Sequence, residues 1–415
     1  MSDSLAAVYR ARDAWSRGLE SRGEGYQALV DHARSRVPFY RDLGATASED
    51  LPVVDRSHYR ATIERFQDIG IDPADGYVLR SSGTTGTPLE VTLDAGAWYA
   101  VNHHFFAQIR ALAGLPDEAF RRGRPAVVFV SNKPGRSNVV RPLPSLDEAL
   151  YLRLQLGEPA ATARFFGSLD APILYGKPTY LLDLRDLLIG QGAKTAPWRP
   201  RLLLVSGEPL YPDDRERLRA YFGAPIVNAL ASTEGGLIAA TEPDGADTDF
   251  AVFGENVRLE VLRDDGVLGP AGSGELVVSN LVNRATVFLR YRSGDRARLL
   301  AGAGPGTQRL GGLQGRDPER LRLAGEELPT ALIAERLRAV SGLLDYQAVA
   351  GSAEGQSVLR WVPDTQGAEP HAVDRELRGA LRELLPADGW QRVTLERAAR
   401  TTAPGGKKRR FVAAL

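Results

Sequence analysis

Apolar runs alternate with amphipathic stretches in the middle of the chain. The short apolar runs predict buried strands, and the stretches between them, which have helical periodicity, predict helices. The strands are expected at 172–176, 201–206 and 225–230, and the helices at 180–189 and 212–222. A β-α-β-α-β order predicts parallel strands joined by right-handed crossovers. The expected fold class is therefore α/β.

The hydrophobic pattern also predicts elements on either side of this core. Residues 4–44 are expected to form two helices, and a helix over 94–113 is followed by a buried strand over 126–130. The segment 131–157 has turn residues and no clear period.

The chain after the parallel strands has a different character. Residues 236–301 are rich in short alternating runs, which predict a small β-subdomain. Glycines cluster over 302–312 and mark a boundary. Helices and strands alternate beyond it, so we expect a large N-terminal domain over 1–314 and a small, mobile α+β domain over 315–415.

Polar clusters follow each of the three predicted parallel strands. They are Gly176-Lys177-Pro178, Ser206-Gly207-Glu208-Pro209 and Ala231-Ser232-Thr233-Glu234. Because ligands of parallel sheets bind beyond the carboxyl ends of the strands, these clusters are expected to meet at one site.

A second candidate site is the loop Ser81-Ser82-Gly83-Thr84-Thr85-Gly86-Thr87-Pro88, which stands between the apolar run 77–79 and the alternating run 89–93. That arrangement predicts strand, loop, strand. Two glycines and five hydroxyls on successive residues suit a nest that wraps phosphate groups. The loop lacks the lysine of a Walker A motif.

Composition narrows the class of protein. The 415 residues are 43% hydrophobic and 25% charged, carry no formal net charge and include no cysteine. Zero net charge gives no field that would favour nucleic acid as a partner. The absence of cysteine excludes a thiolate nucleophile, a thiolate metal site and an acyl-thioester on the chain itself. Neither a signal peptide nor a membrane span is indicated, so a cytoplasmic location is expected.

The loop at 81–88 strongly resembles the phosphate loop of the adenylate-forming superfamily, which includes acyl- and aryl-CoA ligases and the adenylation domains of peptide synthetases. The text around 32–41 and 51–55 is similar to the phenylacetate-CoA ligase and coenzyme-F390 synthetase-like branch. Further motifs of the superfamily follow in order and extend the resemblance over most of the chain.

The resemblance implies a role for each of these motifs. In the superfamily the loop, here Ser81, Ser82, Gly83, Thr84, Thr85 and Gly86, holds ATP phosphates. Gly207, Glu208 and Pro209 correspond to the adenine side, and Leu230 and Ser232 precede Thr233, which contacts the α-phosphate, and Glu234, which holds Mg²⁺. The ribose motif is Tyr291-Arg292-Ser293-Gly294-Asp295, with Asp295 on the ribose hydroxyls, and Gly315-Arg316 opens the C-terminal domain.

The superfamily places its catalytic lysine in a Gly-Lys pair near the C-terminus, and Gly406-Lys407 matches this pattern. A mobile ammonium there stabilises the charge that develops when a carboxylate attacks the α-phosphorus of ATP. The run from Lys407 to Arg410 read by itself is equally typical of a solvated basic tail. The other motifs favour the catalytic interpretation.

Two positions depart from the superfamily pattern. Leu230 stands where an aromatic residue usually stacks on adenine, and Pro318 follows the domain hinge, where it restricts rotation and puts the second half-reaction in doubt. The acyl pocket has no recognisable motif. Our candidates for it are Val128, Val130, Tyr175, Gly176 and His103, which suit an aromatic or small apolar acid.

The expected function is activation of a carboxylic acid, aryl by preference, with ATP and Mg²⁺, followed by transfer of the acyl group to CoA. An alternative within the class transfers it to an amine, a hydroxyl or a carrier-protein thiol. A second alternative is a degenerate protein that binds nucleotide without catalysis.

Overall fold

The computed structural model describes residues 5–21, 25–44, 47, 50–72, 76–80, 88–302, 307–315, 320–351, 356–364, 369–386, 388–402 and 408–413. The chain divides into two compact units, Met1–Leu313 and Gln314–Leu415. No helix in the described ranges is long and apolar enough to cross a membrane.

Unit 1 is a mixed α/β structure, as its sequence pattern predicts. Its helices are α1 (Leu5–Ser21), α2 (Gly25–Arg36), α3 (Pro38–Arg41), α4 (Arg56–Ala61), α5 (Ala95–Tyr99), α6 (Phe105–Leu112), α7 (Pro159–Gly167), α8 (Pro178–Gly190) and α9 (Pro212–Phe222). Its strands are β1 (Tyr77–Arg80), β2 (Glu90–Leu93), β3 (Pro125–Ser131), β4 (Val139–Leu143), β5 (Ala149–Gln155), β6 (Ile173–Gly176), β7 (Leu202–Ser206), β8 (Ile226–Ser232), β9 (Gly236–Ala240), β10 (Asp249–Val252), β11 (Val257–Leu262), β12 (Leu268–Gly269), β13 (Gly272–Asn280), β14 (Tyr291–Leu300) and β15 (Arg309–Gly315).

A thirteen-stranded sheet organises this unit, in the order β12-β11-β13-β14-β15-β10-β9-β8-β7-β6-β3-β5-β4. Strands β5, β3, β6, β7 and β8 are parallel, and β9 pairs antiparallel with β8. The strands expected to form a small β-subdomain are hydrogen-bonded into this same sheet. Strands β4 and β5 lie in the segment 131–157, where the sequence showed no period.

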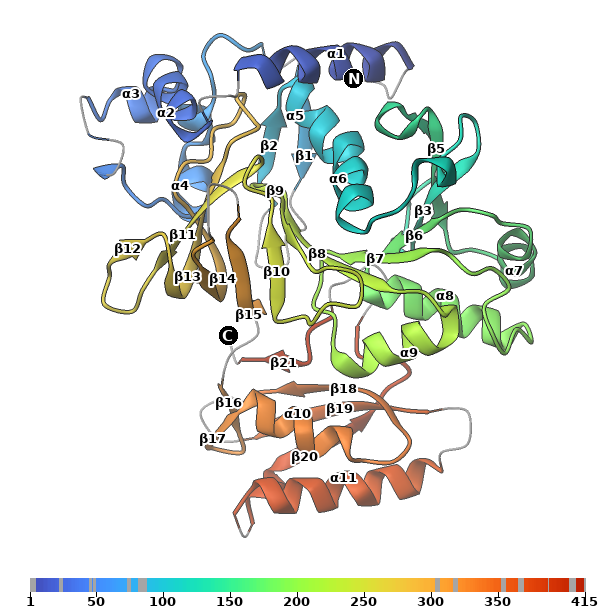
Figure 1. Ribbon diagram of the computed structural model, residues 1–415. Coiled ribbons are helices and arrows are strands. Elements are labelled where there is room, and N and C mark those ends of the chain that lie inside the picture. Colours follow the sequence, from blue (N-terminus) through green and yellow to red (C-terminus); the bar gives the residue numbers. More distant parts are fainter. Residues whose placement is uncertain are drawn as a thin grey trace. The chain divides into compact units, whose positions relative to one another are not determined.

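Two hydrophobic clusters cover opposite faces of the parallel strands. Leu181 and Leu184 of α8 pack with Leu203 and Val205 of β7 on one face. Phe105, Phe106 and Ile109 of α6 pack with Leu202 and Leu204 on the other. Figure 1 shows α8 and α9 on one side of β6–β8 and α6 on the opposite side. Successive side chains of a strand point to opposite faces of the sheet. Because both faces are buried here, the apolar runs are uninterrupted.

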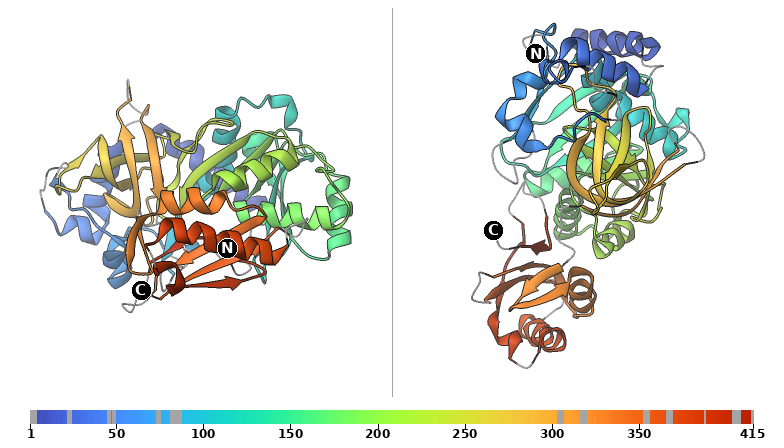
Figure 2. Two further views of the ribbon diagram at one scale, coloured as in Figure 1. Left: turned by 90° about the horizontal axis from the view of Figure 1, so that it is seen from below. Right: turned by 90° about the vertical axis from the view of Figure 1, so that its left-hand side faces the viewer.

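Unit 2 is a smaller α+β structure. Its elements are β16 (Arg320–Leu323), β17 (Glu326–Pro329), α10 (Thr330–Arg338), β18 (Leu343–Val349), β19 (Ser357–Pro363), α11 (Pro370–Leu384), β20 (Val393–Arg397) and β21 (Phe411–Val412). The sheet order is β20-β19-β18-β21. Helices α10 and α11 lie side by side on one face of it (Figures 1 and 2), where Ile333 and Leu377 are buried against Trp361.

A buried ion pair ties the N-terminal segment of unit 1 to the sheet. Arg290, 5% exposed, donates from Nε and Nη2 to the carboxylate of Glu260 at 3.2 and 3.1 Å and from Nη1 to the carbonyl oxygen of Leu51 at 2.8 Å. Its φ of +48° is uncommon for a residue with a side chain. The arginine is therefore held by its partners in a conformation that the backbone alone disfavours.

We predict that Glu260→Gln lowers the free energy of unfolding by about 3–5 kcal/mol, because it leaves the buried guanidinium without a counter-charge. Urea denaturation followed by tryptophan fluorescence measures this. The matched control is Glu275→Gln, which removes the carboxylate partner of the exposed Arg292 on the neighbouring strand pair and is expected to cost about 0–1 kcal/mol. Equal small losses in both variants would contradict the assignment.

Candidate functional site

The polar clusters after β6, β7 and β8 meet at one edge of the sheet, as predicted. The three strands are parallel and in register, so their carboxyl ends lie side by side. The hydroxyl groups of Tyr175 and Ser206 are 2.9 Å apart, and the backbone N–H of Thr179 donates to Glu208 Oε1 at 2.6 Å. These contacts join the ends of β6 and β7 directly.

Glu208 has a structural partner at this edge. Its carboxylate is 9% exposed and accepts the hydrogen bond from Thr179 in the first turn of α8, where backbone N–H groups lack helical partners. Burial lowers the pKa of the neighbouring Lys177, while the charge of Glu208 raises it. Gly207 has a φ of +87°, which a side chain would disfavour. Pro209 is exposed.

The predicted magnesium motif forms the turn between β8 and β9. Glu234 is 6% exposed, and its Oε1 accepts a hydrogen bond from the hydroxyl of Tyr291 at 3.4 Å. Its backbone carbonyl accepts from Asn280 Nδ2 at 2.7 Å, and Ser232 Oγ accepts from the N–H of Gly235 at 2.8 Å. Both the backbone and the side chain of Glu234 are therefore oriented by neighbours.

A lone carboxylate is consistent with a magnesium site of the kind that shares its ion with substrate phosphates. Mg²⁺ is commonly bound by one or two carboxylates together with phosphate oxygens and water. Among the described residues no three histidine, aspartate or glutamate side chains gather into a metal cage. The buried and oriented Glu234 fits a site in which a carboxylate shares Mg²⁺ with substrate phosphates.

The predicted ribose motif lies in an irregular part of β14. Glu275 of β13 is opposite Arg296 and Val277 is opposite Arg292, so residues 293–295 bulge from the ladder opposite a single residue. Gly294 has a φ of +80° within this bulge, and the N–H of Asp295 donates to Ser293 Oγ at 3.1 Å. A bulge re-aims side chains that a regular strand would alternate. Leu230, on β8, is half-buried and packs against the core around β9–β14.

A small cavity adjoins Thr233. It has a volume of about 20 Å³, and its lining combines apolar side chains such as Leu93 and Leu237 with carboxamides such as Gln108. Its lining consists of Leu93, Ala97, Ala100, Val101, Gln108, Thr233, Gly235, Gly236, Leu237, Asn256, Asn280, Val282 and Asn283. The amides of Gln108 and Asn256 bond each other at 3.1 Å in both directions.

The residues suggested for the acyl pocket are divided between the two faces of the sheet. Val128 and Val130 are fully buried beneath α8, whereas Tyr175 packs with Phe105 and Phe106 on the opposite face of the sheet. None of them lines the cavity beside Thr233. Strand alternation explains the separation, because neighbouring strands in register send equivalent positions to one face. Gly176 ends β6 with its Cα against Leu181, where an added Cβ would come within 2.9 Å of that side chain.

His103 is also buried away from this cavity. It belongs to a π-helical turn, Ala100–His104, between α5 and α6, and its ring stacks on Tyr99 with centroids 5.1 Å apart. Burial, and secondarily the charge of Arg141, lowers the pKa of His103 to about 3. The imidazole is therefore neutral and packed. The sequence predicted the helix 94–113 and did not reveal its irregular turn.

Several predicted site residues lie outside the described part of the chain. They are the loop residues 81–87, Arg316, Pro318 and Lys407. The strands that flank the loop are present: β1 and β2 pair antiparallel from Tyr77–Leu93 to Arg80–Glu90, as the sequence predicted.

The structure describes Lys408, the neighbour of Lys407, within unit 2. Lys408 is 3% exposed, and its Nζ lies 2.8 Å from Asp345 Oδ1. Arg410 is 2% exposed, with Nη2 at 3.6 Å from the same oxygen. A solvated basic tail does not describe these two residues. Lys408 is therefore a buried member of an ion pair within unit 2.

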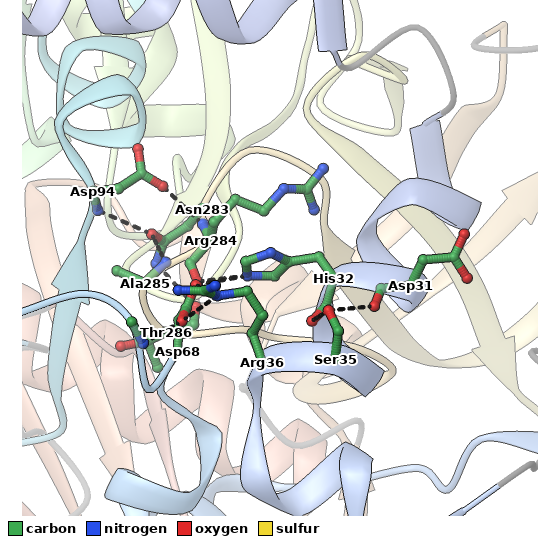
Figure 3. Close-up of polar contacts among 11 residues, drawn as sticks. Asp31, His32, Ser35, Arg36, Asp68, Asp94, Asn283, Arg284, Ala285 and Thr286 are labelled. Atoms are coloured by element: carbon green, nitrogen blue, oxygen red, sulfur yellow. Dashed lines mark hydrogen bonds and ion pairs between the residues drawn. The ribbon is translucent and has the colours of Figure 1, made fainter.

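Sequence reasoning missed the polar segment between β13 and β14. Figure 3 shows Asn283, Arg284, Ala285 and Thr286 of this segment between Asp94, at the start of α5, and His32 of α2. His32 Nε2 lies 3.2 Å from the carbonyl oxygen of Arg284, and burial lowers its pKa. The available signal was the pair Asn280 and Asn283, three residues apart between two strands, because asparagine bonds nearby backbone readily.

Comparison with known proteins gives distant sequence relatives. No family model matches the chain. Phenylacetate-coenzyme A ligase of Pseudomonas putida is 26% identical over 179 residues, 41% of this chain and 40% of that protein. N-(5-amino-5-carboxypentanoyl)-L-cysteinyl-D-valine synthase of Amycolatopsis lactamdurans is 27% identical over 366 residues, 75% of this chain and 9% of that protein. The chain thus spans less than half the length of either relative.

Solved structures match over more of the chain. A 2-hydroxyisobutyryl-CoA ligase in the postadenylation state with 2-HIB-AMP has a TM-score of 0.69 at 19% identity, covering 94% of this chain and 90% of that one. A benzoate CoA ligase from Burkholderia xenovorans has a TM-score of 0.53 at 17% identity, covering 83% and 69%. Together with the ordered sequence motifs, these matches show that the chain has the fold of the adenylate-forming superfamily.

Proposed function

We propose that the chain is an ATP-dependent carboxylate ligase that forms an acyl-adenylate and then passes the acyl group to CoA. The observation that carries this proposal is the edge of the parallel strands, where Thr233 borders a cavity and the adjacent Glu234 is buried with its carboxylate oriented by Tyr291. The fold and the sequence relatives, which are CoA ligases and a peptide synthase, support the same chemistry.

The first step needs no general base. A carboxylate oxygen of the acid attacks the α-phosphorus of ATP, the bond from that phosphorus to the bridging oxygen breaks, and pyrophosphate leaves with its electron pair. The nucleophile is already ionised at neutral pH. Catalysis therefore depends on orienting the two anions and stabilising the charge that grows on the phosphate oxygens.

We assign the chain's residues to these tasks as the sequence motifs indicate. Glu234 holds Mg²⁺, which neutralises phosphate charge when it is bound. Thr233 contacts the α-phosphate, and Asp295 accepts hydrogen bonds from the ribose. Residues Ser81–Gly86 cradle the outer phosphates, and Lys407 bridges the carboxylate and the α-phosphate.

The second step transfers the acyl group. The thiol of CoA loses its proton, its sulfur attacks the acyl carbonyl carbon, and AMP leaves as the carbon–oxygen bond of the mixed anhydride breaks. The match to a peptide synthase over 75% of this chain keeps an amine, hydroxyl or carrier-protein thiol as the alternative acceptor. A non-catalytic nucleotide-binding protein is the alternative from another class, motivated by Leu230 and Pro318.

We predict ATP–pyrophosphate exchange that depends on one class of carboxylic acid. The panel contains benzoic, hydroxybenzoic, aminobenzoic and phenylacetic acids, with small hydroxy acids added because the cavity beside Thr233 is small and has carboxamides among its apolar side chains. With CoA present, AMP and acyl-CoA are expected in equal amounts. AMP without acyl-CoA would replace CoA by another acceptor, and ATP binding without any exchange would favour the non-catalytic protein.

Replacing the proposed catalytic lysine tests its role. Lys407→Ala is expected to lower the rate constant of exchange by about 100- to 1000-fold, as loss of one group that stabilises transition-state charge does elsewhere. The exposed Lys194→Ala, in the loop before β7, is the control and should retain the wild-type rate. Exchange at the wild-type rate in Lys407→Ala would contradict the catalytic role and favour the interpretation of this residue as part of a solvated basic tail.

We propose that the cavity beside Thr233 marks one end of the site for the acyl group, since its volume of about 20 Å³ is close to what a single water molecule needs. Val101 lines it and is half-buried, so its size can change without opening the core. Val101→Phe is expected to raise KM for the acid roughly tenfold or more, in line with the effect of small volume changes in apolar pockets, while KM for ATP stays constant. Val101→Ala should shift the preference towards larger acids. Parallel changes of both KM values would place the acid elsewhere.

A further inference from the structure

The connection between β13 and β14 crosses the interior of unit 1, where the side chains of Asn280, Asn283 and Thr286 all form hydrogen bonds. Asn280, Asn283 and Thr286 are 5%, 1% and 0% exposed. Buried backbone and amide groups must find hydrogen-bond partners within the protein. The partners that these three residues use belong to two different parts of the proposed site. We call residues 280–286 the polar clamp.

One arm of the polar clamp holds the turn that carries Glu234. Asn280 Nδ2 donates to the carbonyl oxygen of Glu234 at 2.7 Å, while its Oδ1 accepts from the N–H groups of Val282 and Asn283 at 2.9 and 3.1 Å. The same side chain thus shapes the clamp and fixes the backbone of the proposed magnesium ligand. Tyr291, at the start of β14, reaches the carboxylate of that ligand.

The other arm holds β2, the strand that follows the predicted phosphate loop. Asn283 Nδ2 donates to the carbonyl oxygens of Thr92 and Thr286, both at 2.9 Å. The N–H of Thr92 donates back to Thr286 Oγ1 at 3.1 Å. Asn283 Oδ1 accepts from the N–H of Asp94 at 3.3 Å, and Asp94 Oδ2 accepts from the N–H of Arg284 at 2.8 Å (Figure 3). Strand β2 is therefore bonded to the clamp along its carboxyl end.

The outer side of the clamp is fixed as well. The N–H of Asp68 donates to the carbonyl oxygen of Ala285 at 3.0 Å, and Arg36 Nε of α2 donates to Asp68 Oδ1 at 2.9 Å. The buried Asp68 therefore links α2 to the clamp, as Figure 3 shows. With both sides fixed, a displacement of the clamp is expected to move Glu234 and β2 together.

We propose that the polar clamp is a positioning element that sets the proposed magnesium ligand and the strand after the phosphate loop at a fixed spacing, with Asn280 acting on the metal and Thr286 on the nucleotide phosphates. This inference rests on the proposed function, because it assigns the two arms to Mg²⁺ and ATP. The two arms can therefore be tested separately. Weakening the Asn280 arm should mainly change the Mg²⁺ dependence of ATP binding, and weakening the Thr286 arm should mainly change the affinity for ATP at saturating Mg²⁺.

The magnesium arm is tested with Asn280→Ala and Asn280→Asp. The aspartate keeps an oxygen for the N–H groups of Val282 and Asn283 and loses only the donor to Glu234. Both variants are expected to raise the Mg²⁺ concentration for half-maximal ATP binding by roughly 3- to 10-fold, the effect of one hydrogen bond. The alanine variant removes the same donor without adding a charge, so a weaker response to Mg²⁺ in both variants is assigned to the lost hydrogen bond to Glu234.

The nucleotide arm is tested with Thr286→Val, which keeps the shape of the side chain and removes the acceptor for Thr92. The matched control is Thr241→Val, since Thr241 is 0% exposed and its Oγ1 accepts from the N–H of Asn228, on β8 of the thirteen-stranded sheet, at 3.0 Å. Both variants lose one buried hydroxyl bond and should melt at similar temperatures. Only Thr286→Val is expected to weaken ATP binding at saturating Mg²⁺, again by roughly 3- to 10-fold.

Titration calorimetry of the full chain with ATP over a series of Mg²⁺ concentrations gives both constants, and ATP–pyrophosphate exchange is run in parallel. Unchanged Mg²⁺ dependence in both Asn280 variants, or equal ATP affinity in Thr286→Val and Thr241→Val, would overturn the positioning role. Wild-type protein that binds Mg²⁺ and ATP without exchange would refute the proposed function. The positioning role of the clamp would then still be tested by the binding constants of the variants. Wild-type protein that binds no ATP would refute both.

Discussion

Satisfying buried backbone polar groups is the constraint on which the site of unit 1 depends. The connection between β13 and β14 runs through the interior, where each unpaired N–H or C=O is costly. Asn283 meets this need with four hydrogen bonds, two donated and two accepted. Because carboxamides can donate and accept at once, asparagine joins strands that do not pair with each other.

The sheet gives that connection its importance. Parallel pairing ends at β8, and the tight turn at Ser232–Gly236 reverses the chain into the antiparallel β9. That reversal leaves Thr233 and Glu234 at the carboxyl edge, beyond the regular ladder. A turn at the margin of a sheet has few ladder bonds of its own. The polar clamp and the hydroxyl of Tyr291 supply the missing constraints.

The chemistry we propose makes modest demands on side chains. The acid supplies its own nucleophile, and pyrophosphate is a competent leaving group when its charge is neutralised, so fixed geometry and cations suffice. This modest demand fits a site with the oriented carboxylates of Glu208 and Glu234 and with hydroxyl and carboxamide groups. It also accounts for the neutral, packed state of His103, because the proposed reaction uses no imidazole.

Lys408 shows that the environment of a side chain can differ from what its local sequence pattern suggests. In the sequence Lys407 and Lys408 are equivalent cations in a basic run. Within unit 2, Lys408 is buried beside Asp345, in the segment that leads into β21 and its pairing with β18. The burial and pairing of Lys408 depend on the fold, because its partner Asp345 lies more than sixty residues earlier in the chain.

The sequence by itself determined the elements with a strong local signal. Uninterrupted apolar runs predicted β6, β7 and β8, their alternation with helices predicted parallel pairing, and parallel pairing predicted that the clusters after Gly176, Ser206 and Ala231 converge. Each inference needed only neighbouring residues and a topological rule. The same holds for β1 and β2, which flank the predicted phosphate loop.

The tertiary structure alone decided which side chains meet across long separations. Val128 and Tyr175 looked alike as pocket candidates, yet register places them on opposite faces of the sheet. Asn280 and Asn283 were not singled out from the sequence, yet they donate to the backbone of Glu234 and Thr92. The physical reason is that hydrophobic period and turn chemistry are local, whereas a hydrogen-bond partner some 190 residues distant depends on how the strands between them are ordered.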